Sequence, residues 1–462
     1  MTDAFRTRTA VPRGEFAFEH QPATEQSFEN ALAKARAGDR LDVEDAVALF
    51  TTGTGGEGID PHRAERVREA ADERRREVVG DEVTFVANLN NNVTTACDTG
   101  CLFCNYRDSA REFEAEYDGE TRGFTKAPDE SHEIVADAVD RGISEVTSVS
   151  GLHPALVLNE DHRAALDPEN PTHGYGRPST YDVDPGSYVD QLWAMSVDDV
   201  HLHAITPEEA QHARRGTKWS YADVYRTLSG AGLDSVPGTA AEILVDEVRE
   251  VICPGKIGTD EWLAAMEAAA TVGLPLTATM MYGHVENERH RAMHLARVRD
   301  LQDRTGAVTE FVPLSFVHEN TALAHRGMVD GGATPLEDLL AVAVSRLFLD
   351  NVDHVQSSWV KFGNERGLDL LNAGADDFMG TILSEEITAR AGGDHGQFRS
   401  FADYVDAITG IDRVPVERST DYERRRRIDP AVAEPGPRLG PRADGTPLLA
   451  ETGPPPSSTA DD

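Results

Sequence analysis

Three of the four cysteines in this 462-residue chain lie within one short window. Cys97, Cys101 and Cys104 have the spacing CxxxCxxC, just after a stretch that predicts a β-strand. Thiolates are soft ligands that suit iron–sulfur centres, and three of them from one loop can hold three corners of a 4Fe-4S cluster. The fourth iron then keeps an open position for S-adenosylmethionine, and electron transfer into the sulfonium would release a 5′-deoxyadenosyl radical.

Two other interpretations of the cysteines are weaker. A structural zinc site needs four ligands, commonly as two pairs, and neither a second CxxC nor a histidine pair follows nearby. The fourth cysteine, Cys253, lies far along the chain in a segment that predicts a helix end. A lone cysteine in such a place usually packs in the core, and a fourth thiolate would close the open iron. We therefore predict a structural role for Cys253.

The composition is strongly acidic. Asp and Glu number 81 against 44 Lys and Arg, which gives a formal charge of −37. This balance disfavours binding to nucleic acid or anionic membranes, and no apolar run reaches the roughly 18 residues that a membrane span needs. We expect a soluble cytoplasmic protein. The only lysines are Lys34, Lys126, Lys218, Lys256 and Lys361, and an acid-rich, lysine-poor surface is typical of proteins that stay soluble in high salt.

The pattern of apolar residues predicts a parallel barrel preceded by an N-terminal helical extension. Residues 28–37, 43–50 and 61–79 have helical spacing, and short β-rich runs then alternate with amphipathic stretches. The predicted strands are Val83–Asn88, Glu145–Val149, Val200–Ala204, Leu233–Val236, Leu276–Tyr282, Val308–Pro313, Val355–Phe362 and Phe378–Leu383. Eight strands separated by helices indicate an α/β fold of the (β/α)8 TIM-barrel type. An open six-stranded barrel is the alternative, since Gly363 and Gly380 interrupt the last two runs.

This pattern divides the chain into four parts. We expect a helical N-terminal extension at 1–80, the barrel at 81–392, a C-terminal helical segment at 393–428 and a disordered, Pro-rich tail at 429–462. Within the barrel, residues 157–186 are polar, and we interpret them as a surface insertion.

In such a barrel the C-terminal strand ends face the active site, so these ends are candidates for chemistry. Gly151 follows the second strand, and a small residue there would let backbone groups reach a bound amino acid moiety. Glu242 follows the fourth, where it could bind ribose or an ammonium group or simply begin a helix. Gly283 and Glu286 follow the fifth, where adenine could stack on backbone while the acid anchors the next helix. His203 lies on the third strand.

Longer stretches of the chain resemble the CofH family of radical S-adenosylmethionine enzymes. The resemblance is carried by Leu233 to Ile257, Ala278 to Glu286, Phe311 to Leu323, Gly-Leu-His-Pro at Gly151 to Pro154, Ser-Trp-Val-Lys at Ser358 to Lys361, and Ala-Gly-Ala-Asp-Asp at Ala373 to Asp377. Together these pieces cover about Val83 to Ala391, which is the whole predicted barrel.

The resemblance implies a transferase that takes the 4-hydroxybenzyl group of L-tyrosine and joins it to 5-amino-6-(D-ribitylamino)uracil. The product would be the precursor that a partner enzyme, CofG, closes to the deazaflavin of coenzyme F-420, and a reductant protein would supply electrons. It also implies that Cys97, Cys101 and Cys104 ligate the cluster, that Gly151, Glu242, Gly283 and Glu286 lie near S-adenosylmethionine, and that His153, His203, Lys361 and Asp376 contact substrate.

One departure and two rival functions follow from the same residues. Ser150 stands where the family usually has a second glycine, which could narrow the approach to the methionine end of the cofactor. A sister enzyme of the futalosine route to menaquinone shares the cysteine loop and the Gly-Leu-His-Pro turn, but the segment Pro237 to Leu244 favours the deazaflavin enzyme. A non-enzymatic iron–sulfur protein is the other rival, although such a carrier usually has a full cysteine set.

The acidic composition makes a prediction about salt. Melting temperature should rise between low and molar potassium chloride, because screening relieves the repulsion among the excess carboxylates. Thermal unfolding at several salt concentrations measures the effect. A flat or falling trend would show that the composition has another cause.

Overall fold

The computed structural model describes residues 18–19, 23–51, 59–109, 113, 116–117, 120–121, 123–164, 183–198, 200–382, 387–390, 392, 399–423 and 425–430. Most of the insertion predicted at 157–186 and nearly all of the tail predicted at 429–462 lie outside these residues. Within the described part, no helix is both long enough and apolar enough to span a bilayer.

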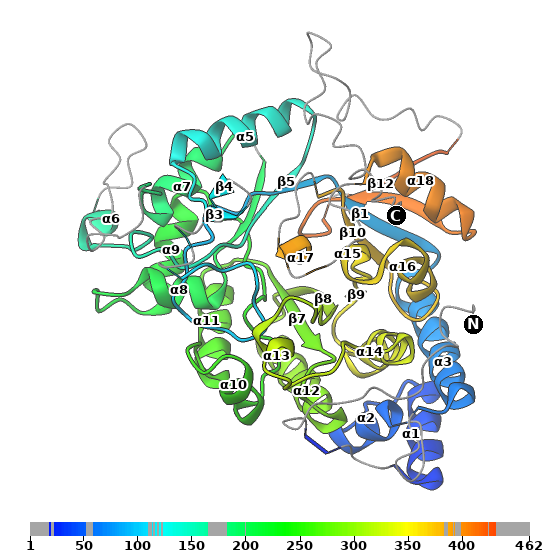
Figure 1. Ribbon diagram of the computed structural model, residues 1–462. Helices are drawn as coiled ribbons and strands as arrows, with labels where there is room; N and C mark the ends of the chain where they lie inside the picture. Colours follow the sequence, from blue (N-terminus) through cyan, green and yellow to red (C-terminus); the bar gives the residue numbers. More distant parts are fainter. Residues whose placement is uncertain are drawn as a thin grey trace, which may run out of the picture.

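Three helices precede the first strand, as the spacing predicts: α1 (Glu25–Ala37), α2 (Val43–Phe50) and α3 (Pro61–Val79). Thr24 and Asp42 form capping boxes that satisfy the first N–H groups of α1 and α2. The apolar side of α3 packs on α14 (Pro335–Phe348), and α2 packs on α12 (Glu288–Thr305). The N-terminal helices α1 to α3 therefore cover helices of the second half of the barrel, at the lower right of Figure 1.

The strands are β1 (Glu82–Val86), β2 (Asn88–Asn90), β3 (Glu116–Tyr117), β4 (Glu120–Thr121), β5 (Glu145–Ser148), β6 (His201–Ala204), β7 (Leu276–Tyr282), β8 (Val308–Ser315), β9 (His354–Val355), β10 (Asp377–Gly380), β11 (Val414–Arg418) and β12 (Arg425–Arg427). The remaining helices are α5 (Pro128–Asp140), α6 (Glu160–Ala164), α7 (Tyr188–Met195), α8 (Pro207–Ala213), α9 (Tyr221–Gly230), α10 (Asp246–Ile252), α11 (Thr259–Thr271), α13 (Ala322–His325), α15 (Trp359–Phe362), α16 (Asn364–Leu370), α17 (Ile387–Arg390) and α18 (Phe401–Gly410).

Parallel strands surround the interior in three separate sheets. Their orders are β2-β5-β6, β7-β8-β9 and β10-β1-β11-β12, and only the β11-β12 pair within them is antiparallel. Isolated parallel bridges join the sheets, from His203 to Ser235, from Val236 to Leu276 and from Gln356 to Asp377. The strands from β5 to β10 thus follow one another in chain order around the interior with helices outside them (Figure 1), while β11 and β12 return to the side of β1. The sheets do not merge into one closed sheet.

Two predicted strands differ from the structure. Residues 233–236 make only single bridges, because Pro237 and Gly238 follow at once and end the extended run. The run 355–362 is strand only at its first residue. Its apolar residues form α15, whose Trp359 donates its indole N–H to the carbonyl of Gly380 at 3.1 Å. A short apolar run can form either a buried turn of helix or a strand, and its composition does not distinguish the two. This is why the prediction of a strand at residues 359–362 is wrong.

In the described part of the segment predicted as helical at 393–428, helix α18 is followed by the strands β11 and β12. β11 adds to β1 in parallel, with Val416 opposite Thr84, and β12 folds back on β11. The five residues Val414–Arg418 lack a clear polar–apolar alternation, so their sequence alone does not distinguish a strand without its partner.

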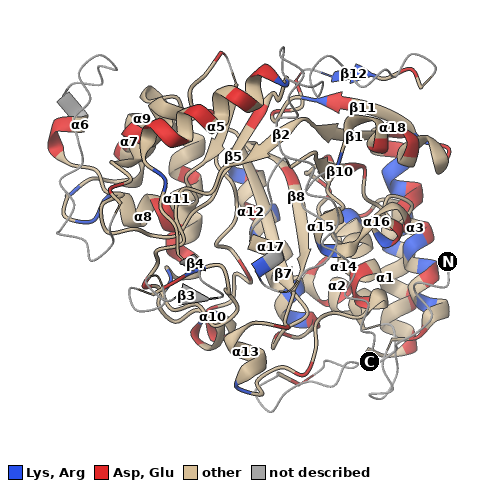
Figure 2. Cartoon of the chain, turned by 45° about the horizontal axis from the view of Figure 1, so that its top comes forward, with Lys and Arg blue, Asp and Glu red and all other residues tan. Residues whose placement is uncertain are grey.

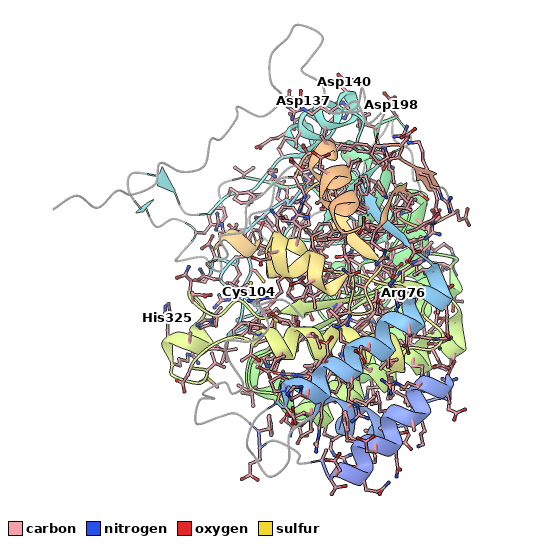
Figure 3. All side chains as sticks on the ribbon, turned by 90° about the vertical axis from the view of Figure 1, so that its right-hand side faces the viewer. Arg76, Cys104, Asp137, Asp140, Asp198 and His325 are labelled. Atoms are coloured by element: carbon pink, nitrogen blue, oxygen red, sulfur yellow. The ribbon has the colours of Figure 1, made fainter. Side chains whose placement is uncertain are left out.

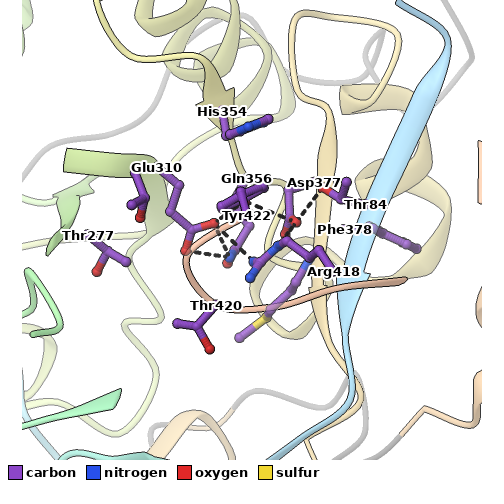
Figure 4. A network of polar contacts seen from close by, with 12 residues as sticks. Thr84, Thr277, Glu310, His354, Gln356, Asp377, Phe378, Arg418, Thr420 and Tyr422 are labelled. Atoms are coloured by element: carbon purple, nitrogen blue, oxygen red, sulfur yellow. Dashed lines mark hydrogen bonds and ion pairs between the residues drawn. The ribbon is translucent and has the colours of Figure 1, made fainter. Parts of the chain in front are cut away.

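Polar residues from several strands meet at the N-terminal end of the barrel, where Arg418 of β11 reaches inside. Its guanidinium donates to Asp377 at 2.5 Å and to Glu310 at 3.1 Å. Tyr422 donates its hydroxyl to Glu310 at 2.6 Å, and Thr84 donates to Asp377 at 2.7 Å (Figure 4). Burial raises the pKa of Glu310 to about 7, and the charge of Arg418 opposes this rise. Strand β11 and the residues just after it therefore close this end of the barrel through buried charge.

Replacing Arg418 with methionine should lower the free energy of unfolding by about 3–5 kcal/mol, because it leaves two buried carboxylates without their cation. Arg427 is the matched control, since it lies in the same segment and pairs with Glu82 but its side chain is 75% exposed. Arg427→Met should cost at most about 1 kcal/mol. Chemical denaturation at constant salt compares the two, and equal losses would contradict the proposed closure.

Candidate active site

A cavity at the C-terminal ends of the strands is lined by all three clustered cysteines, Cys97, Cys101 and Cys104. Cys253 is not among the lining residues. Figure 3 shows Cys104 on the side of the fold that carries His325, well away from Arg76 of α3. The structure thus groups the three residues of the CxxxCxxC motif on one cavity wall, whereas Cys253, which follows the loop-bound Ile252, lies near Cys101 without lining the cavity.

Backbone hydrogen bonds hold residues 91–108, the cysteine loop that follows β2, at two points. The N–H of Cys97 donates to the carbonyl of Asp108 at 3.0 Å, and the N–H of Leu102 donates to the carbonyl of Ile252 at 2.8 Å. Gly100 has a φ of 78°, which the turn between the first two cysteines requires. The loop is therefore bonded both to itself and to the last residue of α10.

The donor set fits an iron–sulfur cluster better than a single ion. Within the described residues, no group of three or more His, Cys, Asp or Glu side chains is arranged to hold one metal ion. A cubane instead binds each thiolate to a different iron, so its ligands stand apart. Burial raises the pKa of the Cys101 and Cys104 thiols. Because iron binds thiolate, a cluster held here would have to displace these protons.

The turn after β5 rests directly on the cysteine loop. A Cβ on Gly151 would lie 2.5 Å from the carbonyl oxygen of Ala96, so this position excludes any side chain. The hydroxyl of Ser150 accepts from the N–H of Val93 at 2.7 Å. Both Ser150 and Gly151 line the cavity. Ser150, which stands where the family usually has glycine, is therefore hydrogen-bonded through its hydroxyl to the backbone of the cysteine loop.

Glu242 also lines the cavity, on a strained backbone. Its φ is 47° and that of Ala240 is 73°, which are left-handed values that non-glycine residues adopt at a cost of about 1–3 kcal/mol. Arg249 compensates by donating to the carbonyls of Ala240, Ala241 and Ile257. Strain that neighbouring contacts hold in place is common at functional sites.

Sequence reasoning missed four charged residues of the cavity wall: Arg107, Glu208, Glu209 and Lys256. Glu208 accepts from the N–H of Ile257 at 2.9 Å. Glu209 completes the capping box of α8 with Thr206, and burial raises its pKa to about 7. Glu208 and Glu209 lie in the first turn of α8, so in the sequence they have the pattern of ordinary residues at a helix N-terminus. Lys256 did carry a signal, since it is one of only five lysines.

The predicted pair Gly283 and Glu286 lies just beyond the cavity wall. Glu286 is fully buried and accepts from the N–H groups of Gly283 at 2.7 Å and His284 at 2.9 Å, while Arg291 pairs with its carboxylate. A Cβ on Gly283 would lie 2.6 Å from the backbone nitrogen of Ala333. The acid thus ties the end of β7 to the helix that follows, and Met281 of the same strand reaches the cavity.

Of the four residues expected to contact substrate, Lys361 lines the cavity and the other three do not. His153 accepts from the N–H of Ala155 at 3.1 Å, and burial lowers its pKa to about 4. His203 contacts the hydroxyl of Ser235 at 2.7 Å inside the barrel, and burial likewise lowers its pKa to about 4.

Asp376 lies just before β10, at the N-terminal end of that strand, where it pairs with Arg346 at 2.5 Å and with His354 at 2.6 Å. The structure therefore does not bring His153, His203 or Asp376 to the cavity, and their contact with substrate stays a prediction.

A short C-terminal helix, α17, completes the wall through Ile387. Arg390 at its end pairs with Asp108 at 3.2 Å, and its guanidinium lies 5.6 Å from the ring centroids of Tyr106 and Phe124. Asp108 and Tyr106 belong to the cysteine loop, so α17 is docked on that loop.

Three thiols on one wall at the end of a parallel barrel are the arrangement expected of a radical S-adenosylmethionine enzyme, and residues 91–298 match the radical SAM superfamily. Methylornithine synthase (PylB), with 16% identity and a TM-score of 0.61, covers 85% of this chain and 99% of its own, and it shares this fold. Residues 305–430 match the CofH/MqnC C-terminal region.

Two curated relatives are named 5-amino-6-(D-ribitylamino)uracil–L-tyrosine 4-hydroxyphenyl transferase. The one from Haloarcula marismortui is 69% identical and covers 95% of this chain and 98% of its own. The one from Halobacterium salinarum is 66% identical, with coverages of 96% and 98%. The chain belongs to this CofH family of radical SAM transferases. The family resemblance in the sequence is confirmed, and the non-enzymatic alternative is wrong because the family is enzymatic.

Substituting alanine at Cys97, Cys101 or Cys104 should each abolish cluster binding, because each removes one of three thiolates on the cavity wall. Cys253→Ala is the matched control and should keep iron and sulfide at the wild-type level. Anaerobic reconstitution followed by iron and sulfide analysis measures the effect. A folded Cys253→Ala protein without cluster would overturn the ligand assignment.

Proposed function

We propose that this chain transfers the 4-hydroxybenzyl group of L-tyrosine to 5-amino-6-(D-ribitylamino)uracil and so makes the precursor of the deazaflavin of coenzyme F-420. The observation that supports this most strongly is the match to curated transferases along nearly their whole length. The C-terminal match covers CofH and MqnC together, so it is the full-length relatives that favour the uracil substrate over the futalosine-type alternative.

The proposed cofactors are a 4Fe-4S cluster on Cys97, Cys101 and Cys104, and S-adenosylmethionine. When bound, they supply a one-electron reductive cleavage that yields the 5′-deoxyadenosyl radical. The residues fit this pair, because three thiols share one wall and the adjoining turn at Gly151 has no room for a side chain. In this proposal the carboxylate of Glu242 and the backbone near Gly151 bind polar groups of S-adenosylmethionine.

The chain itself positions the substrates and excludes water. Lys361 of α15 reaches the cavity, and we assign its ammonium to a carboxylate or carbonyl oxygen of substrate. Gly283 and Glu286 fix the end of β7 against which adenine would stack. Phe103, Phe316 and Ile387 supply apolar wall that limits water near a reactive intermediate.

We further propose that the three sheets work as one (β/α)8 barrel, since single bridges already connect them. The barrel would occupy 81–392, with a helical extension before it and a closing segment at 393–428. A reductant protein would deliver the electron, and CofG would consume the product in the cytoplasm. The acidic residues on outer helices such as α5 and α18 (Figure 2) suit a surface that meets small molecules and soluble partners rather than nucleic acid.

The reaction itself can be tested directly. Reduced, reconstituted enzyme given S-adenosylmethionine, tyrosine and 5-amino-6-(D-ribitylamino)uracil should yield 5′-deoxyadenosine and a hydroxybenzyl–uracil adduct, both measured by mass spectrometry. Phenylalanine in place of tyrosine should react poorly, since a site built for a hydroxyl discriminates strongly against the analogue that lacks it. Turnover of a futalosine-type nucleoside without any use of tyrosine would refute the proposed substrates and leave the cofactor assignment standing.

A further inference from the structure

Lys256 is a buried charge at the cysteine loop that the proposed function does not use. Its side chain is 13% exposed, and its ammonium pairs with Glu242 at 2.7 Å. The same ammonium lies 5.5 Å from the ring centroid of Phe103, which stands between Cys101 and Cys104 in the sequence. Lys256 also lines the cavity with these cysteines. A full positive charge therefore lies beside the place where the cluster would bind.

The segment that carries Lys256 is fixed against the cysteine loop. The carbonyl of Ile252 accepts from Leu102, and a Cβ on Gly255 would lie 2.3 Å from the carbonyl oxygen of Thr99. On the other side of the lysine, the N–H of Ile257 donates to Glu208 at 2.9 Å. Contacts on both sides thus hold the ammonium near the loop.

We propose that Lys256 raises the reduction potential of the cluster, with Glu242 holding its ammonium in position. When the cluster accepts one electron it gains one negative charge, and a nearby cation stabilises that state more strongly where water is scarce. A lysine suits this task because it is a compact point charge, whereas the arginines of the interior spread their charge over several acceptors. The inference rests on the proposed binding of a cluster by the three cysteines.

Removing Lys256 alone would strand the buried carboxylate of Glu242, so the test compares pairs of variants. Glu242→Gln removes the negative charge and should raise the midpoint potential. The double variant Glu242→Gln with Lys256→Met should lie below Glu242→Gln. At a fixed potential its ratio of reduced to oxidised cluster should be about tenfold smaller, which corresponds to about 59 mV for one electron. Lys256→Arg keeps the charge and should stay near wild type.

The measurement is a dithionite titration of the reconstituted cluster without S-adenosylmethionine, followed by electron paramagnetic resonance. Lys126→Met is the matched control. Its ammonium also lies over a ring, 5.3 Å from the centroid of Phe124, but it does not line the cavity. This control should leave the potential unchanged. If the methionine double variant holds no cluster, Lys256→Gln in the same background gives the same comparison.

The outcomes separate the two proposals. A wild-type protein with no 4Fe-4S signal would refute the proposed cofactor. A normal cluster whose potential is the same with and without Lys256 would overturn the inference about Lys256 alone. That inference also fails if Lys256→Arg shifts the potential as far as the neutral replacements do, because shape and not charge would then be responsible.

Discussion

The buried guanidinium of Arg418 determines how the two ends of this barrel differ. It pairs with carboxylates from β8 and β10 at the N-terminal end of the strands and carries the C-terminal strand β11 to the side of β1. An unpaired carboxylate in this interior would be costly, so these strands and β11 stabilise one another. Thr420 extends the same closure to Glu145 of β5 at 2.6 Å. With this end filled by side chains, the cavity lies at the opposite end.

Arginine and lysine have different tasks in the interior. Arg249, Arg346 and Arg413 each donate to two or more backbone carbonyls, which a planar fork of donors does well. These bonds hold irregular segments such as the strained loop before Glu242. Lys256 instead makes one short ion pair at the cavity. A chain that has almost replaced lysine with arginine thus retains a lysine where a localised charge meets the cysteine loop.

How far the sequence can predict this site depends on how local each feature is. The three cysteines form one loop, so their spacing alone indicates their grouping. The strands β5, β6, β7 and β8 lie where β-rich runs predict them, since each run is bounded by cap or turn residues. By contrast, the predictions for β11 and α15 are wrong, because each element is a few residues long and takes its conformation from tertiary partners.

The wall of the cavity is the least predictable part, for the same reason. Glu209 has the pattern of a helix cap, and His203 is a residue expected to contact substrate. Yet Glu209 reaches the cavity, and His203 faces the buried interior. Whether the side chain of a strand residue faces the cavity or the buried interior depends on the strand register and on the position of the residue along the barrel axis. A single sequence gives neither.

The two family matches divide the cavity between them. The half that matches the radical SAM superfamily supplies the cysteines, Gly151, Glu242 and Lys256, while the half that matches the CofH/MqnC C-terminal region supplies Ser315, Lys361 and Ile387. The first set surrounds the place where radical chemistry would begin, which is common to the whole superfamily. The second set lines the remaining wall. The region that matches CofH/MqnC also contains Arg418. The residues that close the N-terminal end of the barrel and the residues of this second set are therefore parts of one family-specific stretch of chain.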